Sequence, residues 1–460
     1  MGAYIASILL SLLSVPLLVR HLGIEAFGQY AAALSVVTIV SGLTEAGLTA
    51  IAVREYAMLP SHRRKALMAN LLGIRIAAGV VGVALATAFA AVAGYGGELV
   101  LGTALAGVGM VIILSQSLLT VPLQVELRQG RVSLLEVLRQ VVSVTLILAL
   151  IALGASVAPF LAVTIPAGLV TLVVTVLLVR GRVVTRPAFD PETWWMLVRD
   201  SIPYALAIAL NAMYIRIAIV VMSIVASGLQ TGYFATSFRI LETLIGVPAL
   251  VIGAAFPILA RAVRDDAQRF AHATARIFEL GVIVGAWMAM CVVITAPLAI
   301  DLIGGAEDAP AVPVLRIQGL ALAATFVIVA CGYPLLAERR YREVLLANVV
   351  GLVASLILTL ALVPSFEAEG AAVATVASEF ALAAASALLL ARSRRGVELP
   401  WRGLPLIALA AGAALLAGLV TPVPAIAQAV IATLVYGAAL IVVRRFPPEL
   451  REALPARARA

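Results

Sequence analysis

Apolar runs of about 20 residues recur along almost the whole chain, and a helix of that length just crosses the hydrocarbon core of a membrane. The runs lack the alternation with period two that a transmembrane β-barrel requires. Of the 460 residues, 63% are hydrophobic and only 12% are charged. A soluble protein of this length would have too few polar side chains for its surface. The sequence therefore predicts an all-α, polytopic integral membrane protein.

The runs predict about 14 transmembrane helices, approximately at 3–19, 26–53, 67–93, 99–124, 133–154, 158–180, 201–226, 231–259, 272–300, 312–336, 343–364, 370–391, 403–420 and 424–443. An internal repeat connects the two halves. The motif of Pro122, Leu123, Glu126 and Arg128 recurs 212 residues later, and Gly28, Tyr30 and Ala31 match Gly232, Phe234 and Ala235 at a shift of 204. Both matches keep the same side of the membrane, so we expect two bundles related by an axis along the membrane normal.

This repeat sets the predicted organisation. Residues 1–180 form an N-terminal six-helix bundle, and residues 201–392 form a pseudo-symmetric C-terminal one. Residues 181–200, with Trp194 and Trp195 among charged residues, form a linker helix at the cytoplasmic interface. Residues 403–443 form two additional, peripheral transmembrane helices, and residues 444–460 form a cytoplasmic tail.

The basic residues predict the orientation. Twenty-seven of the 32 lysines and arginines fall on one side of the predicted membrane, two (Arg20 and Arg316) on the other, and three inside spans. Because cytoplasmic loops are rich in basic residues, we expect both termini in the cytoplasm and the chain in the inner (plasma) membrane. The net charge of +8 is spread over short loops, which argues against a nucleic-acid partner.

No pattern typical of an enzyme is present. Cys291 and Cys331 lie in separate apolar runs and are expected to be small core residues. The three histidines lie near span ends and form no metal-ligand cluster. The sequence contains no Walker loop, nucleophile elbow or HExxH helix. We therefore expect no enzyme activity, no catalytic residue, no metal and no cofactor.

Arg216 and Arg239 are the strongest candidates for a binding site. They flank the predicted turn at Ser227–Gln230 and would lie roughly 17 Å from it, near the middle of the membrane. An arginine there costs at least about 2.5–3.5 kcal/mol, so it usually faces a bundle interior or a watery cavity. The alternative is local neutralisation, for instance of Arg239 by Glu242 one turn along. Two arginines at matched depth favour a site for an anion.

Other polar residues inside the spans extend this candidate site. Glu45 and Arg75 are expected at similar depth, either as a buried ion pair or as a gated carboxylate with its arginine. Glu379 has no obvious partner, so it is either a proton carrier or a hydrogen-bonding group between helices. Asn211 and Tyr214 precede Arg216, and a wide cavity would include them. The acidic residues are candidates for coupling to a proton or sodium gradient.

The chain resembles the polysaccharide-transport proteins of the multidrug/oligosaccharidyl-lipid/polysaccharide exporter superfamily. The similar segments are Leu18–Gly23 with Phe27–Tyr30, Ile202-Pro203 with Tyr214–Arg216, Gly232–Ala235 with Arg239, Val312–Arg316, and Glu369–Ala374. Their order and spacing cover nearly the whole chain. The family usually begins with a basic cytoplasmic segment, whereas this sequence opens within its first span, which leaves open whether Met1 is the true start.

The resemblance implies an alternating-access flippase, similar to O-antigen flippases, that moves undecaprenyl-diphosphate-linked oligosaccharide to the outer leaflet. Arginine offers planar, bidentate donors for phosphate oxygens, so Arg216 and Arg239, with Arg75, are the expected phosphate-binding residues. Membrane lipids, a polysaccharide polymerase and glycosyltransferases are the expected partners. The alternatives are a flippase for the peptidoglycan lipid precursor, a cation-coupled multidrug antiporter, and a membrane-embedded transferase or polymerase. The mid-membrane arginines disfavour the antiporter, and the short outer loops disfavour the transferase.

Overall fold

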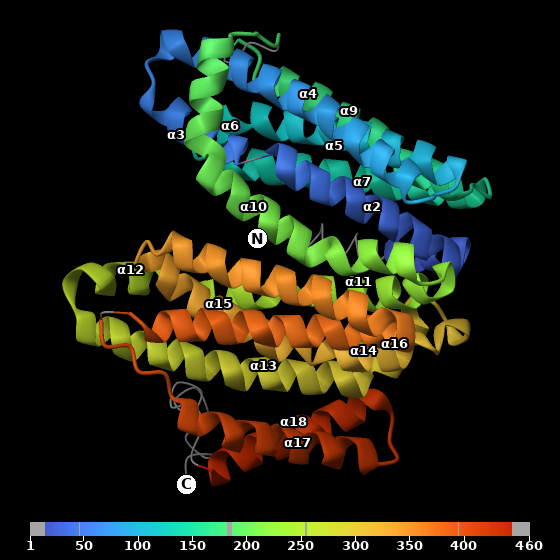
Figure 1. Cartoon of the computed structure of the whole chain (residues 1–460), viewed down its shortest axis with the longest axis vertical. Coiled ribbons are helices and arrows are strands. Elements are labelled where there is room, and N and C mark those ends of the chain that lie inside the picture. Colours follow the sequence, from blue (N-terminus) through green and yellow to red (C-terminus); the bar gives the residue numbers. More distant parts are fainter. Residues whose placement is uncertain (1–13, 46, 182–185, 254, 394, 444–460) are drawn as a thin grey trace. The chain divides into compact units, whose positions relative to one another are not determined.

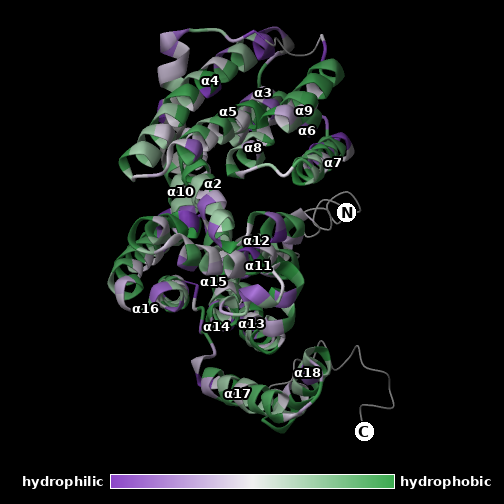
Figure 2. Cartoon of the chain, turned by 90° about the vertical axis from the view of Figure 1, so that its right-hand side faces the viewer, coloured by the Kyte–Doolittle hydropathy of each residue, from purple (hydrophilic) through white to green (hydrophobic). Residues whose placement is uncertain are grey.

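The computed structural model describes residues 14–443, apart from 46, 182–185, 254 and 394. The regular secondary structure of these described residues consists of helices without any strand, which confirms the predicted all-α class. Figure 2 shows hydrophobic residues along most of the helical surface, as expected for helices in contact with lipid. The chain divides into two compact units, Met1–Gly232 (unit 1) and Tyr233–Ala460 (unit 2).

Unit 1 is built around one central helix, α5, which packs against α2, α4, α8 and α9, while α10 packs along α2 (Figure 1). Residues 14–22 are helical, and the helices that follow are α2 (Ile24–Glu45), α3 (Leu48–Met58), α4 (Ser61–Val92), α5 (Gly97–Leu119), α6 (Val121–Val125), α7 (Gln129–Ala152), α8 (Val157–Ala162), α9 (Thr164–Leu178) and α10 (Pro191–Val225).

Unit 2 is built around α13, which packs against α14, α15, α17 and α18. The hairpin of α17 and α18 lies at the edge of this unit, where Tyr436 donates a hydrogen bond to the carbonyl of Ile283 at 3.0 Å (Figure 1). The helices are α11 (Gly228–Gly253), which begins in unit 1, then α12 (Phe256–Asp265), α13 (Ala267–Ile303), α14 (Ala311–Gly319), α15 (Ala321–Ala337), α16 (Tyr341–Ala391), α17 (Leu404–Val420) and α18 (Ala425–Val442).

The described residues contain 11 helical segments long and apolar enough to span a membrane, and one shorter apolar helix, Ala209–Val225. The difference from the predicted 14 has three sources. The first predicted span, 3–19, lies mostly outside the described residues. The spans predicted at 343–364 and 370–391 are joined in α16, across a reversal at Glu367 with φ 48°. The seventh predicted span, 201–226, is the end of the longer helix α10, which begins at Pro191. Only its shorter apolar part, Ala209–Val225, stands out among the described residues.

The linker and the seventh span are therefore one continuous helix, whereas the sequence analysis expected a separate helix at 181–200. Asp190 caps its start by accepting a hydrogen bond from the backbone N–H of Glu192. Trp194 then donates to the side chain of Asn70 on α4, at 3.2 Å. The division between compact units falls after Gly232, not in the predicted linker. The arrangement as two repeated six-helix bundles stays a prediction.

The repeated motif adopts the same backbone structure at both of its occurrences. In the first occurrence, the backbone N–H of Arg128 donates to the carbonyl of Leu123 at 2.8 Å, and that of Leu127 donates to Gln124 at 3.0 Å. In the second occurrence, the N–H of Arg340 donates to the carbonyl of Leu335 at 2.9 Å, and that of Arg339 donates to Leu336 at 3.0 Å. These pairs form a Schellman motif. The residue before each arginine is left-handed, with φ 57° at Leu127 and 58° at Arg339. The internal repeat is therefore real at this turn, down to an unusual backbone conformation.

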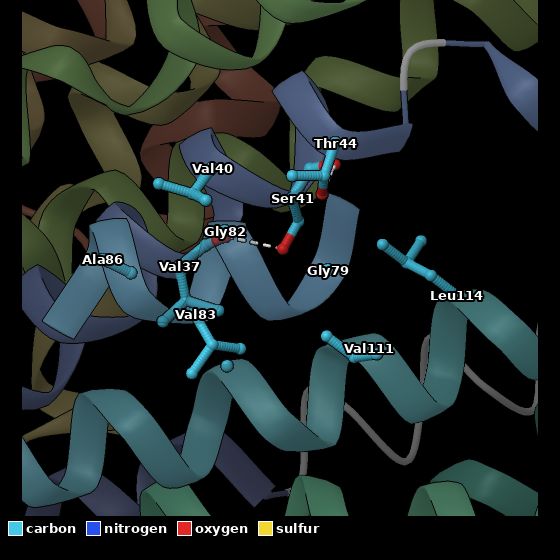
Figure 3. A pocket seen from close by; sticks show the side chains of 11 residues that line it. Val37, Val40, Ser41, Thr44, Gly79, Gly82, Val83, Ala86, Val111 and Leu114 are labelled. Carbon is cyan, nitrogen blue, oxygen red and sulfur yellow. Dashed lines mark hydrogen bonds between the residues drawn. The ribbon is translucent and has the colours of Figure 1, made fainter. Parts of the chain in front are cut away.

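Glycines allow α2, α4 and α5 to approach closely in unit 1. A Cβ on Gly79 would lie 2.7 Å from a methyl group of Val111, and one on Gly82 would lie 2.9 Å from methyl groups of Thr44 and Val40. A small cavity of about 10 Å³ remains at this seam, which is room for roughly one water molecule. Figure 3 shows the side chains that line it. Its lining residues are Val37, Val40, Ser41, Thr44, Gly79, Gly82, Val83, Ala86, Gly107, Val111 and Leu114.

Replacing Leu127 with glycine should stabilise the protein by about 1 kcal/mol, because a left-handed conformation costs an L-residue about that much. The Leu127 side chain is 85% exposed, so little packing is lost. The measurement is the unfolding temperature in detergent. Leu127→Ala is the control and should change little, since alanine bears the same strain. A lower unfolding temperature for the glycine variant would contradict the strain argument.

Replacing Gly79 with leucine should destabilise the protein by roughly 1–3 kcal/mol, because the added side chain must displace Val111 from a packed seam. The matched control is Gly412→Leu in α17, where a Cβ would meet no atom within 4 Å. Thermal unfolding of both variants in detergent measures the difference. Equal unfolding temperatures would show that the seam is not tightly packed.

Candidate functional site

Three of the predicted binding residues lie along α10 in unit 1. Asn211 is exposed, while Tyr214 and Arg216 are half-buried. The face of α10 that meets α2 is marked by Ala212, whose Cβ would lie 2.6 Å from a Cβ placed on Gly42. Arg216 follows Ala212 by four residues and therefore lies on the same face of α10. The long α10 thus holds Arg216 beside α2, among apolar helices.

Arg239 lies on α11 in unit 2 and pairs with the carboxylate of Glu242, with 2.7 Å between Nη1 and Oε2. The two residues are one turn apart on the same helix, which is the local neutralisation that the sequence allowed. The Arg239 side chain is nevertheless 39% exposed, and that of Glu242 24%. Arg239 is therefore both paired and accessible. A joint site with Arg216, which belongs to the other unit, stays a prediction.

Arg75 is packed inside unit 1. Its side chain is 1% exposed, and its Nη2 lies 3.9 Å from Glu45 Oε1 and donates to Thr49 Oγ1 at 3.1 Å. Its Nε and Nη1 have no hydrogen-bond partner among the described residues. A buried N–H without a partner costs about 1–3 kcal/mol. The geometry matches the ion-pair alternative for Glu45 and Arg75, and substrate contact by Arg75 would require this packing to open.

Glu379 bridges two helices of unit 2. Its Oε2 accepts a hydrogen bond from Thr325 Oγ1 at 3.2 Å, so α16 is connected to α15 by a half-buried carboxylate. A second polar contact in the same unit joins Ser237 to Gln318, at 2.9 Å. Gln318 is fully buried, and its side-chain nitrogen has no partner in the described structure. Unit 2 thus contains hydrogen-bonding groups deep among apolar helices.

A polar cavity of about 350 Å³ lies in unit 1 at the end opposite the basic loops. Its lining residues include Glu25, Gln29, Tyr95, Glu98 and Ser223. The Tyr95 and Ser223 hydroxyl oxygens are 2.6 Å apart. Burial raises the pKa of the Tyr95 hydroxyl, which therefore stays protonated and can donate a hydrogen bond. Glu98 accepts from the backbone N–H of Ala158 at 3.2 Å and so fixes the start of α8 beside the cavity.

The charged residues inside the spans could be found in the sequence, but Thr49 and Thr325, which contact Arg75 and Glu379, could not. The hydrogen-bonded pair of Ser237 and Gln318 was also missed. A polar side chain within an apolar run is the signal that was available for Gln318. Threonine and serine give no such signal, because they are common in membrane helices as hydrogen-bond donors to their own backbone. Among the described residues, no group of three or more His, Cys, Asp or Glu is placed to hold a metal ion.

Comparisons with known proteins agree with this architecture. Residues 1–263 match the family described as polysaccharide biosynthesis protein. The fold is similar to that of the lipid II flippase MurJ in an inward closed conformation, with a TM-score of 0.80 at 12% identity, over 96% of this chain and 98% of that one. No curated protein matches the sequence significantly.

The fold is also similar to an inward-facing multidrug resistance MATE family transporter of the MOP superfamily, with a TM-score of 0.67 at 16% identity, over 84% of this chain and 93% of that one. At these identities the structures establish the fold alone, which is a flippase and transporter fold. The family match, in contrast, spans more than half of the sequence. The chain therefore belongs to the polysaccharide biosynthesis protein family and has the fold of MOP-superfamily transporters.

Proposed function

We propose that the protein is a flippase for undecaprenyl-diphosphate-linked oligosaccharide, working by alternating access in the inner membrane with both termini in the cytoplasm. The observation that carries the proposal is the pair of arginines, Arg216 and Arg239, within long apolar helices. A diphosphate brings about two negative charges, which cannot cross bare hydrocarbon at an acceptable cost. Arginine offers planar, paired donors that match phosphate oxygens.

Two further observations support an oligosaccharide as the cargo. The family is named for polysaccharide biosynthesis. The cavity of unit 1 that contains Glu25, Gln29 and Tyr95 offers carboxylate, amide and hydroxyl groups, which are the hydrogen-bonding partners that sugar hydroxyls need. The polyprenyl tail would stay in lipid during transport. A polysaccharide polymerase and glycosyltransferases are then the expected partners, because they consume and make this substrate.

A second candidate function is a flippase for the peptidoglycan lipid precursor. The similarity to a structure named as a lipid II flippase favours it, since that match spans nearly all of both chains. Both candidates carry a polyprenyl diphosphate, so both use the arginines in the same way. A cation-coupled multidrug antiporter is disfavoured, because a cationic drug would meet Arg216 and the accessible Arg239.

We propose that transport is coupled to a proton or sodium gradient through Glu45 or Glu379. Each is half-buried inside a span and has a polar contact that a bound cation would alter: Glu45 Oε1 lies 3.9 Å from Arg75 Nη2, and Glu379 Oε2 accepts a hydrogen bond from Thr325. When a partly buried carboxylate binds a proton or a sodium ion, its electrostatic interaction with neighbouring side chains changes strongly. The protein's own residues would then carry the coupling, without a metal cofactor.

Alanine at Arg216 or Arg239 should reduce transport at least tenfold, because each charge-assisted contact to a phosphate is worth more than about 1.4 kcal/mol. The measurement is transport of an undecaprenyl-diphosphate oligosaccharide by the purified protein in liposomes, with lipid II as the parallel substrate. Lysine at either position should restore part of the activity, since it supplies charge without the planar fork. Faster transport of lipid II than of the oligosaccharide would favour the second candidate.

The matched control for this experiment is Arg276→Ala. Arg276 pairs with Glu279 on α13 across 3.3 Å, three residues apart, as Arg239 pairs with Glu242, but it lies near the predicted cytoplasmic end of its helix. This variant should transport normally. Full transport by the Arg216→Ala, Arg239→Ala double variant, at normal protein level and thermal stability, would disprove the proposed site.

Glutamine at Glu45 or Glu379 should leave folding intact and abolish the dependence of transport on an imposed gradient, because glutamine has nearly the same size but cannot ionise. At Glu379 it can also still accept the hydrogen bond from Thr325. Transport is measured with and without a proton or sodium gradient across the liposome membrane. Unchanged gradient dependence in both variants would assign these carboxylates a structural role.

A further inference from the structure

A second polar cavity in unit 1 lies between α5, α6 and α7 and is separate from the predicted substrate residues. Its volume is about 390 Å³, within the range of small-molecule sites. Uncharged hydrogen-bonding side chains line one wall, and a charged pair lies on the other. The lining residues are Ile113, Leu114, Gln116, Ser117, Thr120 and Gln124 from α5 and α6, and Val132, Ser133, Leu135, Glu136 and Arg139 from α7.

The cavity lies at the surface of unit 1, beside α7. Only Leu135 and Val144 are buried among the residues of α7, so most of this helix faces outward. The turn at Arg128 begins α7 on the predicted cytoplasmic side, and Glu136 lies eight residues further, about 12 Å along the helix and three residues into the span predicted at 133–154. The head-group layer is roughly 5–7 Å thick on each side of the hydrocarbon. The charged pair therefore lies just beneath the lipid head groups.

The cavity contains one positive and one negative side chain, Arg139 and Glu136, which form an ion pair. Arg139 reaches back one turn to Glu136 and donates to it from Nε at 3.2 Å, in the direction that helical side chains favour. The two side chains remain 26% and 53% exposed. A diphosphate would be repelled by Glu136, and a simple cation would be repelled by Arg139. A ligand that carries a phosphate and an ammonium group a few ångströms apart complements both.

We propose that this cavity binds the zwitterionic head group of a phospholipid from the cytoplasmic leaflet, of the phosphatidylethanolamine type. The phosphate lies at Arg139 and the ammonium group at Glu136, where charge-assisted hydrogen bonds replace the bond within the pair. The amide and hydroxyl groups of Gln116, Ser117 and Thr120 line the opposite wall. The bound lipid joins α7, which otherwise packs on α6, α8 and α9, to the central helix α5.

The experiment measures lipid retention by the purified full-length protein. Delipidated protein in detergent is mixed with phosphatidylethanolamine or with phosphatidylglycerol, and native mass spectrometry counts the lipids that remain bound. We expect one tightly held phosphatidylethanolamine per chain. The Glu136→Gln, Arg139→Gln double variant should retain it about tenfold less, because two charge-assisted bonds are lost. The swapped variant, Glu136→Arg with Arg139→Glu, should recover binding, since it keeps both charges.

The control variant is Arg276→Gln with Glu279→Gln, which removes a similar pair from α13, outside this cavity. It should retain phosphatidylethanolamine as the unaltered protein does. Ser133→Leu keeps both charges but places a larger side chain in the cavity, so it should also lose the lipid. This variant tests the proposal independently if the double variant fails to fold. Equal retention of phosphatidylglycerol by the unaltered protein, or equal retention of phosphatidylethanolamine by the double variant and the control, would overturn the proposal.

Discussion

The cost of placing charge in hydrocarbon is the constraint on which the rest of this structure depends. An arginine at the centre of a membrane helix costs at least about 2.5–3.5 kcal/mol, so a chain keeps it only where a partner or a function repays that cost. Within the described spans, Arg75 has Glu45 and Thr49, Arg239 has Glu242, and Glu379 has Thr325. Each charge is held by a neighbour one turn away or on the next helix.

The packing of the helices also follows from the hydrocarbon environment of the membrane. Lipid tails are as apolar as leucine, so burial from water cannot drive helices together inside the membrane. Close packing at small residues takes its place, as at Gly79 and Gly82 on α4, where side chains of α5 and α2 pack directly against the glycines. Arg75 and Glu45 lie one turn beyond this seam on α4 and α2. The ion pair and the glycine seam therefore fix the same interface, one by charge and the other by shape.

Much of the fold could be predicted from hydropathy, because length and apolarity define a membrane helix. The turn at Glu126–Arg128 and its repeat could also be predicted, since a whole motif recurs. The continuity of the linker with the seventh span, as the single helix α10, could not be predicted. A helix that continues beyond the membrane has no continuous apolar run to mark it. The cavity beside Arg139 could not be predicted either, since it depends on which face of α7 meets a neighbour.

Local neutralisation of Arg239 by Glu242 is compatible with the proposed role of Arg239 in substrate binding. A transport site must release what it binds, so its net affinity has to stay modest. The Glu242 carboxylate accepts a hydrogen bond from Arg239 Nη1 at 2.7 Å, and a phosphate at Arg239 would compete for this donor. Binding then exchanges one charge-assisted bond for another, and its free energy is the difference between the two. When the phosphate leaves, Glu242 returns, and no bare charge remains in the low-dielectric interior. If Arg239 binds the substrate as proposed, the carboxylate beside it lowers the free-energy cost of substrate release.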